Sequence, residues 1–158
     1  MLHSALIAAH AASGIAAFAA GCMGLRPRAR GVGGVAPVHR VYLGTLWAMV
    51  LLLLAVVALD WPALPLTGRV IYGALSLLAL YMGWRGWHAL GDLRGRVAGW
   101  EGAYVDDVGF TLIAVFDGFV IIAALDLHAP VWLVLAVGVL AIVVGRRAVQ
   151  RTKERAAS

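Results

Sequence analysis

Five runs of mostly apolar residues constrain this chain more than any other feature of its sequence. A helix that crosses a bilayer needs about 20 such residues, because the hydrocarbon layer is about 30 Å thick and an α-helix rises about 1.5 Å per residue. The runs cover residues 2–22, 41–59, 70–90, 108–125 and 129–145. Since lipid offers no hydrogen bonds to backbone groups, each run predicts a helix. We expect an all-α fold, a polytopic transmembrane helix bundle of five spans within residues 1–145.

Composition supports the membrane class and excludes others. Of the 158 residues, 63% are hydrophobic and 13% are charged, whereas a soluble domain has roughly 45–50% apolar and about 25% charged residues. This excess of apolar residues argues against a disordered chain. Cys22 is the only cysteine, so a domain held by internal disulfides is also excluded. We expect the lipid bilayer, and no nucleic acid, to be the partner of this chain.

The basic residues predict how the bundle is oriented. Lysine and arginine near span ends are retained on the cytoplasmic side of a membrane. With the N-terminus outside, every lysine and arginine except Arg69 falls on an inner segment. We therefore expect the N-terminus outside the cell (inner) membrane, the C-terminus in the cytoplasm, and residues 146–158 as a basic cytoplasmic tail.

Two alternatives to this topology are weaker. A four-span chain with residues 108–145 as one element would carry Asp126, His128 and Pro130 through lipid. A cleaved signal peptide would begin with positive charges, but residues 1–5 contain none. We expect the first run to be a retained span.

Asp117 is the most informative polar residue, because it lies in the fourth run with apolar residues on either side. It falls about 12 Å from the cytoplasmic edge, where a carboxylate needs a partner, a proton or water. Arg85 and His10 lie at depths from which they could reach it. We expect a buried polar centre of Asp117, Arg85 and His10, which either serves function or only sets helix register. Residues that could hydrogen-bond to this centre are Ser13, Tyr81 and Thr111.

Two histidines lie at one depth near the cytoplasmic ends of the second and third runs. His39 and His88 have the arrangement that a bis-imidazole haem or a metal ion needs, so haem b or a metal ion is a candidate cofactor. Contact with lipid headgroups is the alternative. A weaker group at the outer side comprises His3, His128, Asp60 and Asp126.

An acidic segment lies between the third and fourth runs. Carboxylates there could hold Mg²⁺ for phosphate chemistry on a lipid or isoprenoid substrate. They are Asp92, Glu101, Asp106 and Asp107. The alternative is a solvated acidic loop, and we expect residues 91–107 to lie along the cytoplasmic interface.

Small residues recur at every fourth position of the first run, where they would let another backbone approach closely. They are Ala5, Ala9, Ser13, Ala17 and Gly21, and similar pairs occur at Ala79 and Gly83 and at Ala114 and Gly118. Packing within the bundle is one interpretation. A homo-oligomer or a partner membrane subunit is the other.

The pattern of His10 in the first span and His39-Arg40 before the second resembles a family of small bacterial multi-span membrane proteins, which is catalogued as a domain of unknown function. That family has a glycine four residues after the histidine of the His-Arg pair, whereas in this sequence the glycine, Gly44, lies five residues after His39. Glu101 stands where the family often has a further histidine. The resemblance implies the same multi-span fold, and this departure removes one candidate ligand.

Three hypotheses for function follow. The first is a coupling protein that moves protons, electrons or a small solute through the centre of Asp117, Arg85 and His10. The second is a non-enzymatic assembly or interaction subunit of a membrane complex. The third is a membrane enzyme that acts on a lipid or isoprenoid substrate.

Overall fold

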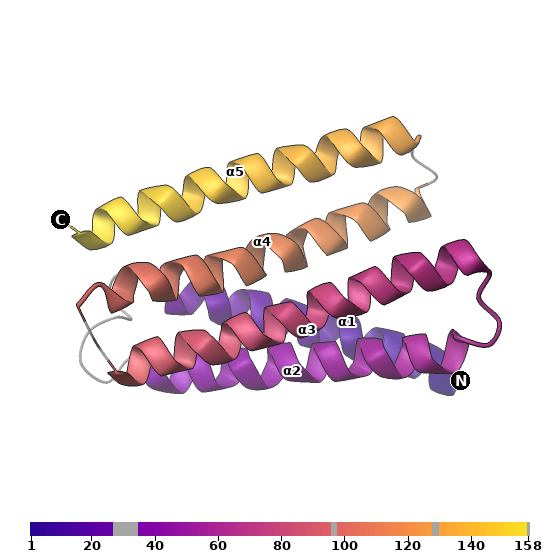
Figure 1. The fold of residues 1–158 in the computed structure, drawn as a ribbon, viewed down its shortest axis with the longest axis horizontal. Coiled ribbons are helices and arrows are strands. Elements are labelled where there is room, and N and C mark those ends of the chain that lie inside the picture. The colour runs from indigo at the N-terminus through magenta and orange to yellow at the C-terminus, as the bar shows by residue number, and fades with distance from the viewer. Residues whose placement is uncertain (27–34, 96–97, 128–129, 158) are drawn as a thin grey trace.

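A computed structural model places the chain in five α-helices that lie side by side in one bundle (Figure 1). The structure describes residues 1–26, 35–95, 98–127 and 130–157. No β-strand occurs within these residues, so the predicted all-α class is confirmed. The helices are α1 (Leu2–Gly24), α2 (Val35–Asp60), α3 (Leu66–Gly95), α4 (Trp100–Asp126) and α5 (Val131–Ala157).

Every helix continues beyond the apolar run that predicted it. Within residues 91–107, which we expect along the cytoplasmic interface, residues 91–95 form the end of α3 and residues 100–107 form the first turns of α4. Most of the predicted tail at residues 146–158 is likewise a continuation of α5. Hydropathy marks where lipid lies, but arginine, lysine and glutamate are also good helix formers, so a helix need not stop where the apolar run stops.

Prolines agree with the observed helix starts. Pro37 lies in the first turn of α2, where its missing N–H group would have no helical partner. Pro65 and Pro130 each lie directly before a helix, α3 and α5 respectively. The fixed φ of proline suits these positions, and no described helix is interrupted by a proline in its interior.

Successive helices run in opposite directions, so the C-termini of α1, α3 and α5 share one end of the bundle with the N-termini of α2 and α4 (Figure 1). We call this the basic end. The described basic residues that mark it are Arg26, Arg40, Arg94, Arg151 and Lys153. The two chain termini lie at opposite ends of the bundle (Figure 1).

The buried core lies among α1, α2, α3 and α4 and is built largely from the halves of these helices nearer the basic end. Tyr42 and Tyr104 are its largest fully buried side chains. Glycines let the helices approach closely around them: a Cβ atom on Gly86 would lie 2.8 Å from Leu46, and one on Gly21 would lie 2.7 Å from Leu112. The core therefore depends on small residues at the helix contacts.

Large apolar side chains also cover the outside of the bundle. Exposed examples occur on all five helices, including Ile15, Leu51, Leu77, Phe116 and Val139. An apolar surface this extensive is unstable in water but suits contact with lipid. Within the described residues, α1, α2 and α3 are long and apolar enough to cross a membrane. The chain therefore has the character of a membrane protein.

In the second half of α1, the small-residue stripe packs against other helices of the bundle. Ala17 and Gly21 of the stripe are buried, as is the neighbouring Gly14, whereas Ala5 and Ala9 are exposed. A Cβ atom on Gly14 would lie 3.0 Å from Phe119 of α4. Intramolecular packing thus accounts for the stripe near the basic end.

The contact between α4 and α5 depends on two glycines that face the partner helix. A Cβ atom on Gly109 would lie 2.5 Å from Val149, and one on Gly145 would lie 2.5 Å from Ile113. Val149 and Ile113 are β-branched and cannot easily turn aside. Each glycine therefore sets how closely α5 can approach α4.

The substitution Gly109→Ala should destabilise the protein by about 1–3 kcal/mol, because the added methyl group overpacks the contact with Val149. Gly118→Ala on the same helix is the matched control, since nothing lies within 4 Å of its Cβ position. The control should be neutral or stabilising by up to about 1 kcal/mol. Thermal unfolding in detergent measures both, and equal effects would contradict the close α4–α5 contact.

Candidate functional site

Four charged or titratable side chains gather on α3 and α4 near the basic end. We call Arg85, His88, Asp92 and Asp107 the charged cluster. Arg85 Nε lies 2.5 Å from Asp107 Oδ1, and His88 Nδ1 lies 2.8 Å from Asp107 Oδ2. His88 Nδ1 also lies 3.7 Å from Asp92 Oδ2. Asp107 is therefore the centre of the cluster, with one carboxylate oxygen atom close to Arg85 and the other close to His88.

Helix geometry explains why these residues meet. Arg85, His88 and Asp92 are spaced by three and four residues, so they share one face of α3. Asp107 lies in the second turn of α4, which runs back alongside α3 after a short connection. The last turns of α3 and the first turns of α4 thus bring their polar faces together.

Burial differs across the cluster. The side chain of Asp107 is only 9% exposed, that of Arg85 is 21% exposed, and that of His88 is 57% exposed. His88 therefore lies at the surface of the cluster and Asp107 at its buried side. A buried carboxylate is costly without a partner, and Arg85 supplies one that keeps its charge.

Aromatic rings hold the guanidinium of Arg85 in place. Its Cζ lies 5.0 Å from the ring centre of Phe110 and 5.8 Å from that of Tyr81. Arg85 also donates a hydrogen bond of 3.2 Å to the hydroxyl group of Tyr81. The ring faces and this hydroxyl orient the guanidinium toward Asp107.

A second polar layer lies deeper in the core. The hydroxyl groups of Tyr42 and Thr111 are hydrogen-bonded to each other, and both side chains are buried. Thr111 lies one helical turn beyond Asp107, and Tyr42 lies within electrostatic range of Asp107 and Arg85. The polar groups therefore continue inward from the charged cluster.

The predicted centre of Asp117, Arg85 and His10 is not formed. Asp117 lies ten residues beyond Asp107 on α4, a separation of about 15 Å that exceeds the reach of Arg85. It faces α5, where a Cβ atom on Gly138 would lie 3.2 Å from its Oδ1. His10 donates instead from Nδ1 to the backbone carbonyl of Met49 over 2.9 Å.

Of the three residues predicted to hydrogen-bond to that centre, two join the polar groups around Asp107 instead. Tyr81 accepts a hydrogen bond from Arg85, and Thr111 bonds Tyr42. Ser13 is half-buried on α1. The sequence predicted Asp107 as a candidate Mg²⁺ ligand or as part of a solvated acidic loop, but not as the partner of Arg85. The signal that could have found it is its position directly before the apolar run of α4.

The structure does not bring His39 and His88 together as a pair of haem ligands. The ring of His39 is fully buried between those of Tyr42 and Tyr104, and its Nδ1 lies 3.3 Å from the Tyr104 hydroxyl. His88 is exposed and bonds Asp107. These environments do not fit a haem b held by both imidazoles.

The predicted Mg²⁺ ligands and the predicted outer group of histidines and aspartates lie in different parts of the bundle. Asp106 lies on a different face of α4 from Asp107 and pairs with Lys153 of α5 at 2.5 Å, so the four predicted Mg²⁺ ligands do not converge. His3 and Asp60 do meet, at 3.0 Å, on the end opposite the basic end. His128 and the side chain of Asp126 lie outside what the structure describes.

Three atoms of the charged cluster could hold a metal ion. His88, Asp92 and Asp107 each offer one ligand atom, and these atoms lie within 4.8 Å of one another. One imidazole and two carboxylates are a ligand set for a divalent transition metal. Arg85 places a positive charge on the other oxygen of Asp107, which opposes a cation there.

Comparison of the chain with protein-family models, with curated proteins and with solved structures finds no match. The resemblance to a family of small bacterial membrane proteins therefore stays a prediction.

The substitution Asp107→Asn should destabilise the protein by about 3–5 kcal/mol, because it leaves the largely buried guanidinium of Arg85 without its counter-charge. Asp106→Asn is the matched control on the neighbouring residue. Its pair with Lys153 is about half exposed, so the loss should be about 0–1 kcal/mol. Thermal unfolding in detergent compares the two variants, and similar losses would show that the Arg85 pair does not hold the helices together.

Proposed function

We propose that this chain is a multi-pass membrane protein with five spans that moves protons across the membrane, with its charged cluster as the site of proton entry. The observation that carries the proposal is the position of Asp107, between the permanent charge of Arg85 and the titratable ring of His88. Buried hydroxyl groups lie further inward. Together these groups connect the basic end with the interior.

His88 is the group that exchanges protons with water. Its side chain is 57% exposed, and imidazole titrates near neutral pH when it is not perturbed. The ring can take a proton at Nε2 while it gives the Nδ1 proton to Asp107 Oδ2, 2.8 Å away. Exposure on one side and a carboxylate on the other are what a proton entry site needs.

Charge balance favours a proton as the species that binds. With His88 neutral, Arg85, Asp92 and Asp107 sum to one negative charge, and a single proton makes the cluster neutral. A divalent cation would instead leave it with one positive charge. Since the cluster is partly buried, the neutral state costs least.

Asp107 can pass the effect of protonation inward. A proton on Asp107 removes the negative charge that holds Arg85, and the carboxyl group becomes a hydrogen-bond donor. The hydrogen-bonded hydroxyls of Tyr42 and Thr111 are the next polar groups. Hydroxyl groups both donate and accept, so they can relay a proton or respond to the loss of the charge.

Proton movement can be measured in liposomes that contain the purified protein and a pH-sensitive dye, with a potential imposed by potassium and valinomycin. The wild type should acidify the lumen faster than protein-free vesicles. His88→Gln and the pair Arg85→Leu with Asp107→Leu should fall to the protein-free rate. Because the paired change replaces both charges, it should fold, and Asp106→Asn should keep the wild-type rate.

A divalent metal ion is the second candidate, because the three ligand atoms lie close together. Mn²⁺ titration followed by electron paramagnetic resonance distinguishes it. Stoichiometric binding that His88→Gln and Asp92→Asn abolish, with no proton uptake by the wild type, would replace the proton proposal with a metal site.

The topology that we propose has the N-terminus outside the cell (inner) membrane and the C-terminus in the cytoplasm, because the basic end carries the described lysines and arginines other than Arg69. Reporter fusions should therefore place the two termini in different compartments. Termini on the same side would contradict five spans.

A further inference from the structure

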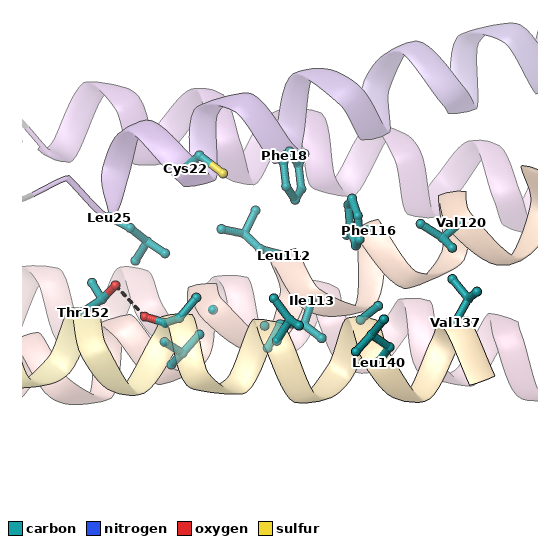
Figure 2. Close-up of a pocket in the computed structure, with 16 residues that line it drawn as sticks. Phe18, Cys22, Leu25, Leu112, Ile113, Phe116, Val120, Val137, Leu140 and Thr152 are labelled. Atoms are coloured by element: carbon teal, nitrogen blue, oxygen red, sulfur yellow. Dashed lines mark hydrogen bonds between the residues drawn. The ribbon is translucent and has the colours of Figure 1, made fainter. Parts of the chain in front are cut away.

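We propose that an apolar groove between α1, α4 and α5 binds one acyl chain of an anionic phospholipid, with the lipid headgroup at the basic end. The groove has a volume of about 510 Å³ and lies apart from the charged cluster. Figure 2 shows its walls: Phe18 and Cys22 of α1 face Leu112 and Phe116 of α4, and Leu140 belongs to α5. This proposal does not depend on proton coupling.

The groove exists because α5 packs along α4 and leaves α1 uncovered on that side. The two glycine contacts at Gly109 and Gly145 hold α5 against α4. α1 contacts α4 over a smaller surface, so a lateral opening remains between α1 and α5. In a membrane such an opening faces the acyl chains of the lipid.

The length of the groove suits a single acyl chain. Along α4 the lining extends from Gly109 to Val120, a rise of about 17 Å, and one leaflet of the hydrocarbon layer is about 15 Å thick. The length of the lining therefore matches one acyl chain of one leaflet.

Charge at the mouth selects the headgroup. Leu25 and Thr152 line the groove at the basic end (Figure 2). Arg26 follows Leu25 and Arg151 precedes Thr152, and both arginines are exposed. Arg26 also lies within electrostatic range of Cys22 inside the groove. A phosphate between these two arginines would leave its acyl chain directed into the groove.

Native mass spectrometry of the purified full-length protein in detergent tests the proposal, with phosphatidylglycerol and phosphatidylcholine as probes. The wild type should retain one phosphatidylglycerol in preference to phosphatidylcholine. Ala148→Phe, which fills the groove, should weaken phosphatidylglycerol binding at least tenfold. Ala136→Phe is the matched control, because Ala136 is also exposed on α5 but does not line the groove.

Two further measurements distinguish recognition of the lipid headgroup from binding of the acyl chain, and they do not depend on a bulky substitution that could cause misfolding. Arg26→Gln with Arg151→Gln should remove the preference for phosphatidylglycerol, while Arg147→Gln should keep it. In the wild type, phosphatidylglycerol should slow alkylation of Cys22 by a maleimide. Unchanged binding by Ala148→Phe, no lipid preference in the wild type, or unprotected Cys22 would each overturn the proposal. A dimer that covers this face would also overturn it.

Discussion

The ion pair between Arg85 and Asp107 is the interaction on which the basic half of the bundle depends. It joins α3 to α4 beside the buried core, and it allows two charged residues to lie next to apolar side chains. Without the pair, each charge would have to move toward water, and the last turns of α3 would separate from the first turns of α4. The close glycine contacts of α3 with α2 and of α4 with α5 then attach the remaining helices to this pair.

Polarity falls in steps from the basic end inward. The exposed ring of His88 comes first, the Asp107 carboxylate second, and the Tyr42–Thr111 hydroxyl pair third. At the opposite end the helices are joined by single polar contacts, such as His3 with Asp60. This asymmetry gives the bundle one end that can respond to protons and lipid headgroups, while its outer surface offers lipid mainly apolar side chains.

The existence and order of the helices could be predicted because lipid-facing helices are long apolar runs, and prolines mark several of their starts. The residues at which the helices end could not be predicted, since arginine, lysine and glutamate continue a helix as well as leucine does. The predicted partner of Arg85 was wrong for a related reason. Depths measured from the ends of the apolar runs place Asp117 within reach of Arg85. Asp107 lies in the first turns of α4, which extend beyond the apolar run, and it is closer to Arg85.

The amino-acid sequence by itself determined the helical class, the apolar character and the gathering of basic residues at one end, because these follow from composition and from the alternation of helix direction. Only the tertiary structure decided which side chains meet. A contact between helices depends on the rotation of each about its axis, and that rotation is set by the fit of side chains against glycines such as Gly86 and Gly109. The rotation turns Asp107 toward α3 and Asp117 toward α5, and it leaves α1 and α5 far enough apart for a groove.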